Sequence, residues 1–159
     1  MTDQQTTEPL DLLALESQVC FALAVASRRV IGLYRPLLEP MGLTHPQYLV
    51  MLALWQHEPL TVRELAGKLS LESATLSPLL KRLEAIGYLT RPRHPDDERA
   101  LQVGLTPAGR KLRERALDIP PAMMAKLQMD VDELQDLHGR LTDLIKRATD
   151  AEASPDPNS

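Results

Sequence analysis

The sequence predicts a mainly α-helical protein in which one pair of short β-strands interrupts the helices. Three observations support this fold class. Apolar residues recur at helical spacing, as in Leu76, Leu79, Leu80 and Leu83. Helix start signals, such as the capping box of residues 61–64, bound these stretches. Only residues 88–91 and 101–105 have the pattern of short strands. With 159 residues, the chain fits one domain of ordinary size.

The sequence pattern of residues 1–57 indicates a polar N-terminal segment followed by two helices. Residues 1–9 are expected to be disordered, and residues 10–38 read as one long helix. That helix is apolar on several faces, which is unusual for the surface of a small monomer. Pro40 and Gly42 end it, and Thr44 caps a helix over residues 45–57. The core face of this second helix is expected to include Leu49, Leu52 and Trp55.

The middle of the chain predicts a winged helix-turn-helix. A short helix after Thr61 turns Val62, Leu65, Ala66 and Leu69 inward, and a break at residues 70–73 separates it from a helix over residues 74–86. Gly87 stops that helix, and the two strands follow with a charged loop, residues 92–99, between them. Helix, turn, helix and charged hairpin together form a winged helix-turn-helix, which we place at residues 41–105.

The C-terminal part predicts further helices. Thr106 and Pro107 start a helix that runs to about Leu117, is divided by Pro120 and Pro121, and resumes to Met129. A last helix starts at residue 130 and ends near Thr149, and residues 151–159 are expected to be a disordered tail.

The composition excludes several classes of protein. No apolar run approaches the roughly 18 residues of a membrane span, and the polar, acidic start lacks a secretory signal, so we expect a cytoplasmic protein without membrane contact. A single cysteine excludes an intrachain disulfide framework. Four scattered histidines (His45, His57, His94 and His138) have no metal-ligand spacing, and neither a Gly-rich phosphate loop nor a nucleophile–base pair is present. We therefore expect no enzyme, no metal and no cofactor.

The distribution of charge indicates a polyanion as partner. Residues 63–115 hold 11 basic and 7 acidic residues, whereas the rest of the chain holds 7 basic and 15 acidic ones. The second helix of a helix-turn-helix enters the major groove of DNA, with a wing able to reach the minor groove. The expected DNA-binding residues are Ser73, Thr75, Ser77, Lys81 and Arg82 on that helix, with Arg93, Asp97 and Arg99 in the hairpin. Asp97 is expected to orient Arg99.

Several motifs resemble those of the MarR family of bacterial transcription regulators. They are residues 76–91 (LSPLLKRLEAIGYLTR), Asp97-Glu98-Arg99, and residues 105–109 (LTPAG). The resemblance implies a homodimer on a palindromic DNA operator, with residues 10–40 and 106–150 intertwined as the dimerisation region. Residues 43–51 (LTHPQYLVM) and 20–23 (CFAL) further resemble the OhrR branch, whose members repress organic-hydroperoxide resistance genes and release DNA when a cysteine in the first helix is oxidised.

Cys20 is the candidate redox sensor. By residue type alone, a lone cysteine is most often a buried apolar residue, whereas reactivity needs hydrogen-bond donors or positive charge nearby. Tyr34 lies 14 residues further on, roughly 21 Å along a straight helix, so the two side chains can meet only across a dimer. The resemblance implies that tyrosines of the partner subunit bond the sensing cysteine. Tyr34 matches that pattern, whereas Ala24 and His45 stand where the family usually has tyrosine; with Phe21 they complete the expected sensor pocket. His45 can still donate to a thiolate.

A single cysteine restricts the chemistry after oxidation. The expected fates of a sulfenic acid on Cys20 are a mixed disulfide with a small thiol, a sulfenamide, or overoxidation. Two alternatives stay open at this point. One is a ligand-responsive regulator in which a small aromatic or phenolic effector binds and Cys20 is structural. The other is a dimerisation module that does not bind DNA.

Overall fold

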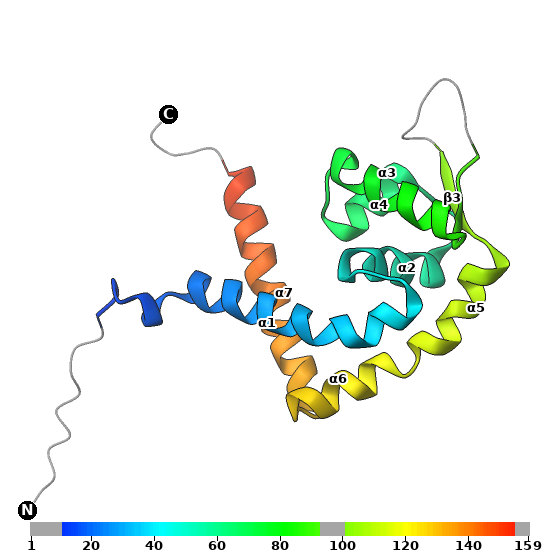
Figure 1. Ribbon diagram of the computed structural model, residues 1–159. Coiled ribbons are helices and arrows are strands. Elements are labelled where there is room, and N and C mark those ends of the chain that lie inside the picture. Colours follow the sequence, from blue (N-terminus) through cyan, green and yellow to red (C-terminus); the bar gives the residue numbers. More distant parts are fainter. Residues whose placement is uncertain (1–10, 93–100, 155–159) are drawn as a thin grey trace, which may run out of the picture. The chain divides into compact units, whose positions relative to one another are not determined.

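The computed structural model describes residues 11–92 and 101–154 and divides into two compact units at Arg115 and Ala116. The first unit runs through α1–α5 and carries the three strands. The second consists of α6 (Ile119–Leu127) and α7 (Val131–Ala153). Figure 1 labels the helices of both units and colours the chain from blue at the N-terminus to red at the C-terminus.

The first long helix, α1, spans Val19–Leu38 and begins later than the sequence predicts. Before it, residues 11–18 form only a single 3-10 turn, η1 (Leu15–Ser17). Gln18 at the helix start makes no side-chain cap, and Leu12 and Leu13 are 71% and 92% exposed. A helix this apolar gains most of its stability from packing against other parts of the protein. Leu12 and Leu13 are exposed in the single chain, so packing does not stabilise a helix before Val19.

The second helix, α2, spans His45–His57 as predicted, but its core face is different. Gly42 in the left-handed region (φ 72°) follows the 3-10 turn η2 (Glu39–Met41), and Thr44 and Gln47 form a capping box. Leu49 and Leu52 are exposed, and the helix instead buries Gln47, Tyr48, Val50, Met51 and Leu54. Because α2 is apolar on more than one face, its periodicity does not determine which face is buried.

The helix-turn-helix is formed by α3 (Val62–Leu69) and α4 (Ser73–Ile86), as predicted. Thr61 and Glu64 form the expected capping box, and Gly87 ends α4 in the left-handed region at φ 98°. The inner faces of the two helices meet in the core, where Leu65, Leu76, Leu80 and Leu83 are fully buried.

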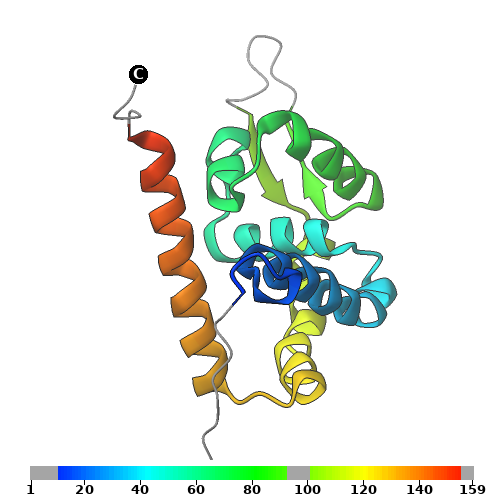
Figure 2. The same cartoon turned by 90° about the vertical axis from the view of Figure 1, so that its left-hand side faces the viewer.

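The wing belongs to a three-stranded antiparallel sheet rather than to an isolated pair of strands. The predicted strands are β2 (Leu89–Thr90) and β3 (Gln102–Leu105). A third strand, β1 (Leu60–Thr61), pairs with the other edge of β3, which gives the order β1-β3-β2. Leu60 faces Val103 and Leu89 faces Leu105, and all four side chains are buried. Figure 2 shows these strands next to the helix-turn-helix.

The helices after the sheet follow the predicted divisions. Helix α5 (Pro107–Ala116) starts at the predicted proline, and Pro120 and Pro121 lie in the first turn of α6. Helix α7 begins with a capping box between Asp130 and Glu133 and continues beyond the predicted end, to Ala153. Every residue of α7 is exposed or half-buried.

Candidate functional site

Helix α4 presents the predicted polar and basic side chains outward. Thr75, Lys81 and Arg82 are exposed, and Ser73 and Ser77 are half-buried. The opposite face of the same helix is anchored by the fully buried leucines of the core. The outer face is therefore held rigidly by packing, as a surface that reads another molecule requires.

The N-terminus of α4 carries free backbone donors that the sequence analysis did not identify. Glu72 occupies the cap position, and no side chain among the described residues caps the helix. The Glu72 carbonyl accepts from the amides of Thr75 and Leu76, so the Ser73 and Ala74 amides that precede them have no acceptor within the helix. Such amides, together with the helix dipole, favour an anionic group such as phosphate.

The three predicted wing residues, Arg93, Asp97 and Arg99, lie outside the described residues. The base of the hairpin is described. The Arg91 side chain forms an ion pair with Glu84 of α4, with 3.3 Å between Nε and Oε2, and only 10% of the Arg91 side chain is exposed. This pair connects the end of β2 to the helix-turn-helix.

Cys20 is the second residue of α1, and its side chain is exposed in this chain. Residue type alone predicts a buried cysteine. This prediction is wrong for the single chain. Ala24, one turn further along, is exposed, and Phe21 is 42% exposed. This end of α1 is an uncovered, largely apolar surface.

Tyr34 and His45 come together, as members of one aromatic cluster. Their ring centroids are 4.9 Å apart, and Tyr48 of α2 lies 5.8 Å from Tyr34 and 6.3 Å from His45. Burial raises the pKa of Tyr34, and burial together with the charge of Tyr34 raises the pKa of Tyr48. Burial lowers the pKa of His45 below its ordinary 6.5. At neutral pH the cluster therefore presents protonated phenols and a neutral imidazole.

The sequence analysis did not identify Tyr48 as part of this cluster, although a signal was present. Tyr48 follows His45 by three residues, which places both on one side of α2. Cys20 is not brought to the cluster within the chain, because it precedes Tyr34 by 14 residues of the same helix.

The connector between α1 and α2 (Glu39–Leu43) is held from two directions. The Tyr88 hydroxyl donates to the Met41 carbonyl at 2.8 Å, and the Arg115 guanidinium donates to the Pro40 carbonyl at 3.1 Å. Tyr88 lies between α4 and β2. Its hydrogen bond therefore joins the α1–α2 connector to the base of the wing. Tyr88 and Met41 are 47 residues apart in sequence, so local sequence patterns cannot predict this hydrogen bond.

Among the side chains that the structure describes, no group of three or more His, Cys, Asp or Glu is arranged to hold a metal ion. Within the same residues, every helix is too short or too polar to cross a membrane.

Comparison with known proteins identifies the family. The MarR family model matches residues 43–101. The organic hydroperoxide resistance transcriptional regulator of Bacillus subtilis is 41% identical over 86% of this chain and 92% of its own length. Reduced AbfR bound to DNA has a TM-score of 0.69 at 33% identity, covering 85% of this chain and 94% of that one. Disulfide-formed AbfR has a TM-score of 0.60 at 32% identity, covering 88% and 93%. AbfR comes from Staphylococcus epidermidis. With a relative this similar along nearly its full length, a matching family model and the same fold, the chain belongs to the MarR family.

Proposed function

We propose that this protein is a homodimeric transcriptional repressor that binds a palindromic operator and leaves it when an organic hydroperoxide oxidises Cys20. The observation that carries the proposal is the similarity, along nearly the whole chain, to a regulator of organic hydroperoxide resistance. The single cysteine of this chain, exposed on α1, supplies the reactive group. Such a repressor acts in the cytoplasm, without a membrane partner or a cofactor.

Helix α4 enters the major groove of each half-site. Ser73, Thr75 and Ser77 are short enough to reach base edges and phosphates near the start of the helix, and Lys81 and Arg82 contact phosphate further along. The uncapped amides of α4 add phosphate contacts. In the wing, Arg93 and Arg99 reach the minor groove, with Asp97 orienting Arg99.

The redox step is a two-electron oxidation of sulfur. The Cys20 thiolate attacks the terminal oxygen of the hydroperoxide, a sulfur–oxygen bond forms and the oxygen–oxygen bond breaks. Cys20 becomes a sulfenic acid, and the departing alkoxide takes up a proton to leave as an alcohol. A small thiol then condenses with the sulfenic acid, which releases water and gives a mixed disulfide.

The partner subunit supplies the surroundings of Cys20. In a straight α1, Tyr34 and His45 lie too far from Cys20 of the same chain, whereas those of a second copy can reach it. The pKa of Tyr34 is raised by burial, so its hydroxyl stays protonated and donates to the thiolate. The pKa of His45 is lowered by burial, so at neutral pH its ring offers an N–H but no positive charge. Hydrogen bonds rather than an ion pair therefore stabilise the thiolate.

Oxidation releases DNA by changing the geometry of the dimer. The two recognition helices must lie about one helical turn of DNA apart, roughly 34 Å, to occupy adjacent half-sites. An adduct on Cys20 occupies space between α1 of one subunit and the aromatic cluster of the other. Shifting the equilibrium by about 1.4 kcal/mol changes DNA affinity tenfold, so a modest displacement suffices.

Fluorescence anisotropy with DNA from upstream of the protein's own gene tests the proposal. Reduced wild type is expected to bind tightly, to release DNA after cumene hydroperoxide, and to bind again after dithiothreitol. Cys20→Ser is expected to bind and to ignore the oxidant. If wild type keeps its DNA affinity after mass spectrometry shows a sulfenic acid or mixed disulfide on Cys20, the proposed switch is wrong.

The DNA-binding half of the proposal has its own test. Lys81→Gln is expected to weaken binding to all sequences and, because each dimer loses two lysines, to reduce the slope of log K against log salt concentration by about 2. Lys146→Gln, an exposed lysine on α7, is the matched control and should leave the slope unchanged. An equal effect of the two variants would exclude α4 as the DNA-binding helix.

A further inference from the structure

The C-terminal end of α2 is tied to the wing through Glu58. Glu58 directly follows α2, and 25% of its side chain is exposed. Its carboxylate oxygen Oε2 accepts from the backbone amide of Leu105 at 2.7 Å, and Oε1 accepts from Nε of Arg110 at 2.7 Å. Leu105 ends β3 and Arg110 lies in α5, so one side chain joins three elements of the fold.

The register of the sheet explains why a side chain is used here. Leu60 of β1 faces Val103 of β3, so an antiparallel continuation of β1 would place residue 58 opposite Leu105. However, β1 starts at Leu60, directly after Pro59. The Glu58 carboxylate therefore provides the acceptor that a longer β1 would offer to the Leu105 amide. Such a hydrogen bond to a charged group is roughly twice as strong as one between neutral groups.

A second contact holds the same end of α2 to α5. The indole of Trp55, three residues before Glu58, donates to the Gly109 carbonyl at 2.9 Å. Gly109 and Arg110 are neighbours in α5, so α2 holds α5 at two adjacent residues. A displacement of this end of α2 is therefore passed to both α5 and β3.

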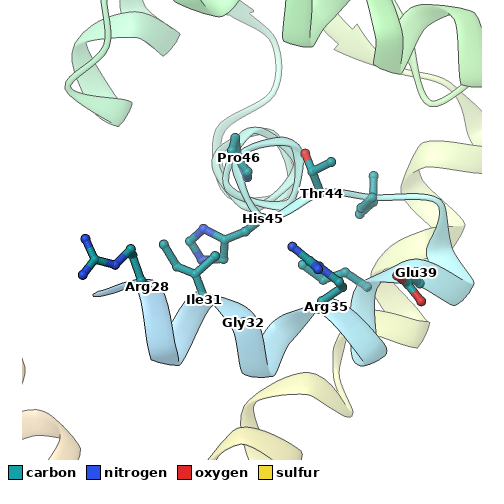
Figure 3. A pocket seen from close by; sticks show the side chains of 10 residues that line it. Arg28, Ile31, Gly32, Arg35, Glu39, Thr44, His45 and Pro46 are labelled. Carbon is teal, nitrogen blue, oxygen red and sulfur yellow. The ribbon is translucent and has the colours of Figure 1, made fainter. Parts of the chain in front are cut away.

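The opposite end of α2 carries side chains of the proposed sensor. His45 is the first residue of α2, and its ring lies 4.9 Å from that of Tyr34 on α1. Figure 3 shows the His45 ring directed from the start of α2 toward α1, beside Ile31. An adduct on Cys20 of the partner subunit that displaces this cluster therefore displaces the start of α2.

Between its two ends, α2 is firmly packed. Val50, Met51 and Leu54 have no exposed surface, and the 13 residues of α2 span roughly 20 Å. Protein interiors are packed as closely as organic crystals and transmit strain. We therefore expect α2 to move as a rigid body, so that a displacement at His45 reaches Glu58.

We propose that Glu58 is a positioning residue for DNA release, because it passes the displacement of α2 that follows Cys20 oxidation on to the wing strand β3. The inference rests on the proposed function and names the contact through which the sensor moves the wing. Glu58 acts through Leu105 and Arg110, and we expect it to hold both in the reduced and in the oxidised protein.

The ratio between the DNA affinities of reduced and oxidised protein tests this role. Anisotropy titrations of the full-length protein, with the upstream DNA and cumene hydroperoxide, give this ratio for each variant. Glu58→Gln keeps an acceptor for the Leu105 amide but removes the charge that binds Arg110. We expect the ratio to fall about fivefold, because α2 then carries β3 along less completely. A purely structural role would lower both affinities by the same factor and leave the ratio unchanged.

Two further single variants locate the effect. Arg110→Gln breaks the ion pair but leaves the bond from Leu105 to Glu58 intact. The Arg110 side chain is 56% exposed, so this variant should fold even if Glu58→Gln does not. We expect it to lower the ratio about twofold, since an exposed ion pair contributes little. Glu114→Gln removes the same charge from an exposed position of α5 and should keep the wild-type ratio.

Amide hydrogen exchange at Leu105 follows the contact directly. We expect the Leu105 amide of wild type to stay protected in both redox states, because Glu58 keeps its hydrogen bond while the wing moves. Protection that is lost when Cys20 is oxidised would mean that the contact breaks instead of passing the displacement on, and would overturn the inference.

The outcomes separate this inference from the proposed function. If wild type keeps its DNA affinity after Cys20 is oxidised, the proposed function fails and the inference falls with it. If wild type releases DNA and both Glu58→Gln and Arg110→Gln keep its affinity ratio, only this inference fails. A ratio that falls equally in Glu114→Gln would assign the effect to charge alone and would also overturn the inference.

Discussion

His45 stands where the OhrR branch, which this sequence resembles, usually has a tyrosine. The burial of His45 makes the free energy of unfolding depend on pH. Since burial lowers the pKa of His45 below 6.5, the unfolded chain binds the proton more readily than the folded one. The free energy of unfolding therefore rises with pH between the folded-state pKa and 6.5, and falls as the solution is acidified through that window.

The His45→Gln variant tests this linkage. The side chain of Gln does not titrate, so we expect the variant to lose the part of the pH dependence that His45 causes. Urea denaturation of reduced wild type and variant from pH 5 to 7.5 measures it. The stability difference between the two proteins should change with pH in favour of wild type toward pH 7.5. A difference that is constant with pH would contradict the assignment.

Gly109 is a second residue whose identity the structure explains. It lies in the first turn of α5, where its amide donates to the Thr106 hydroxyl at 3.0 Å and its carbonyl accepts from the Trp55 indole at 2.9 Å. A Cβ at this position would lie 2.2 Å from the Tyr88 carbonyl oxygen. The close approach of α5 to the start of β2 thus requires glycine.

Gly109→Ala is expected to destabilise the protein by roughly 1–3 kcal/mol, because the backbone must move to relieve the clash. Gly67→Ala is the matched control, since a Cβ on Gly67 of α3 meets nothing within 4 Å. The control should be neutral or stabilising by about 0.5–1 kcal/mol. Thermal and urea unfolding of both variants compares them. Equal effects would show that the helix tolerates a methyl group beside Tyr88.

At the scale of elements, local signals predicted most boundaries, and tertiary contacts decided the rest. The cap at Thr44 and the stop at Gly87 fixed α2 and α4. The buried face of α2 and the pairing of β1 with β3 could not be predicted, because both depend on residues distant in sequence. The sequence also predicts too early a start for α1, which begins at Val19 and not at residue 10. An apolar run shows where a helix can form, but it does not show whether another part of the protein packs against it.

The hydrogen bond from Tyr88 to the Met41 carbonyl belongs to this scale, because it joins the α1–α2 connector to the wing. We expect Tyr88→Phe to lower the free energy of unfolding by about 0.5–1.5 kcal/mol. We also expect a smaller ratio between the DNA affinities of reduced and oxidised protein, since a displacement at the cluster then reaches the wing less directly. Anisotropy titrations of both redox states measure the ratio. If both affinities fall by the same factor, the bond is structural only.

At the scale of the whole molecule, the outward face of α4 could be predicted from one chain, whereas the surroundings of Cys20 in an assembled protein could not be derived from helical periodicity. The outward face of α4 follows from helical periodicity within the chain. The proposed sensor needs groups of a second copy around Cys20, and in the single chain Cys20 is exposed. The exposed Leu12, Leu13, Phe21 and Ile145 are consistent with a covering partner.

The position of Cys20 and Tyr34 on the same helix, 14 residues apart, also has a genetic consequence. If each sensor combines Cys20 of one subunit with Tyr34 of the other, chains carrying Cys20→Ser and chains carrying Tyr34→Phe are each defective alone. A mixed dimer of the two contains one site with both native residues. Cells expressing both alleles should then regain part of the peroxide response, as intersubunit complementation, whereas a sensor contained within one chain would give no rescue.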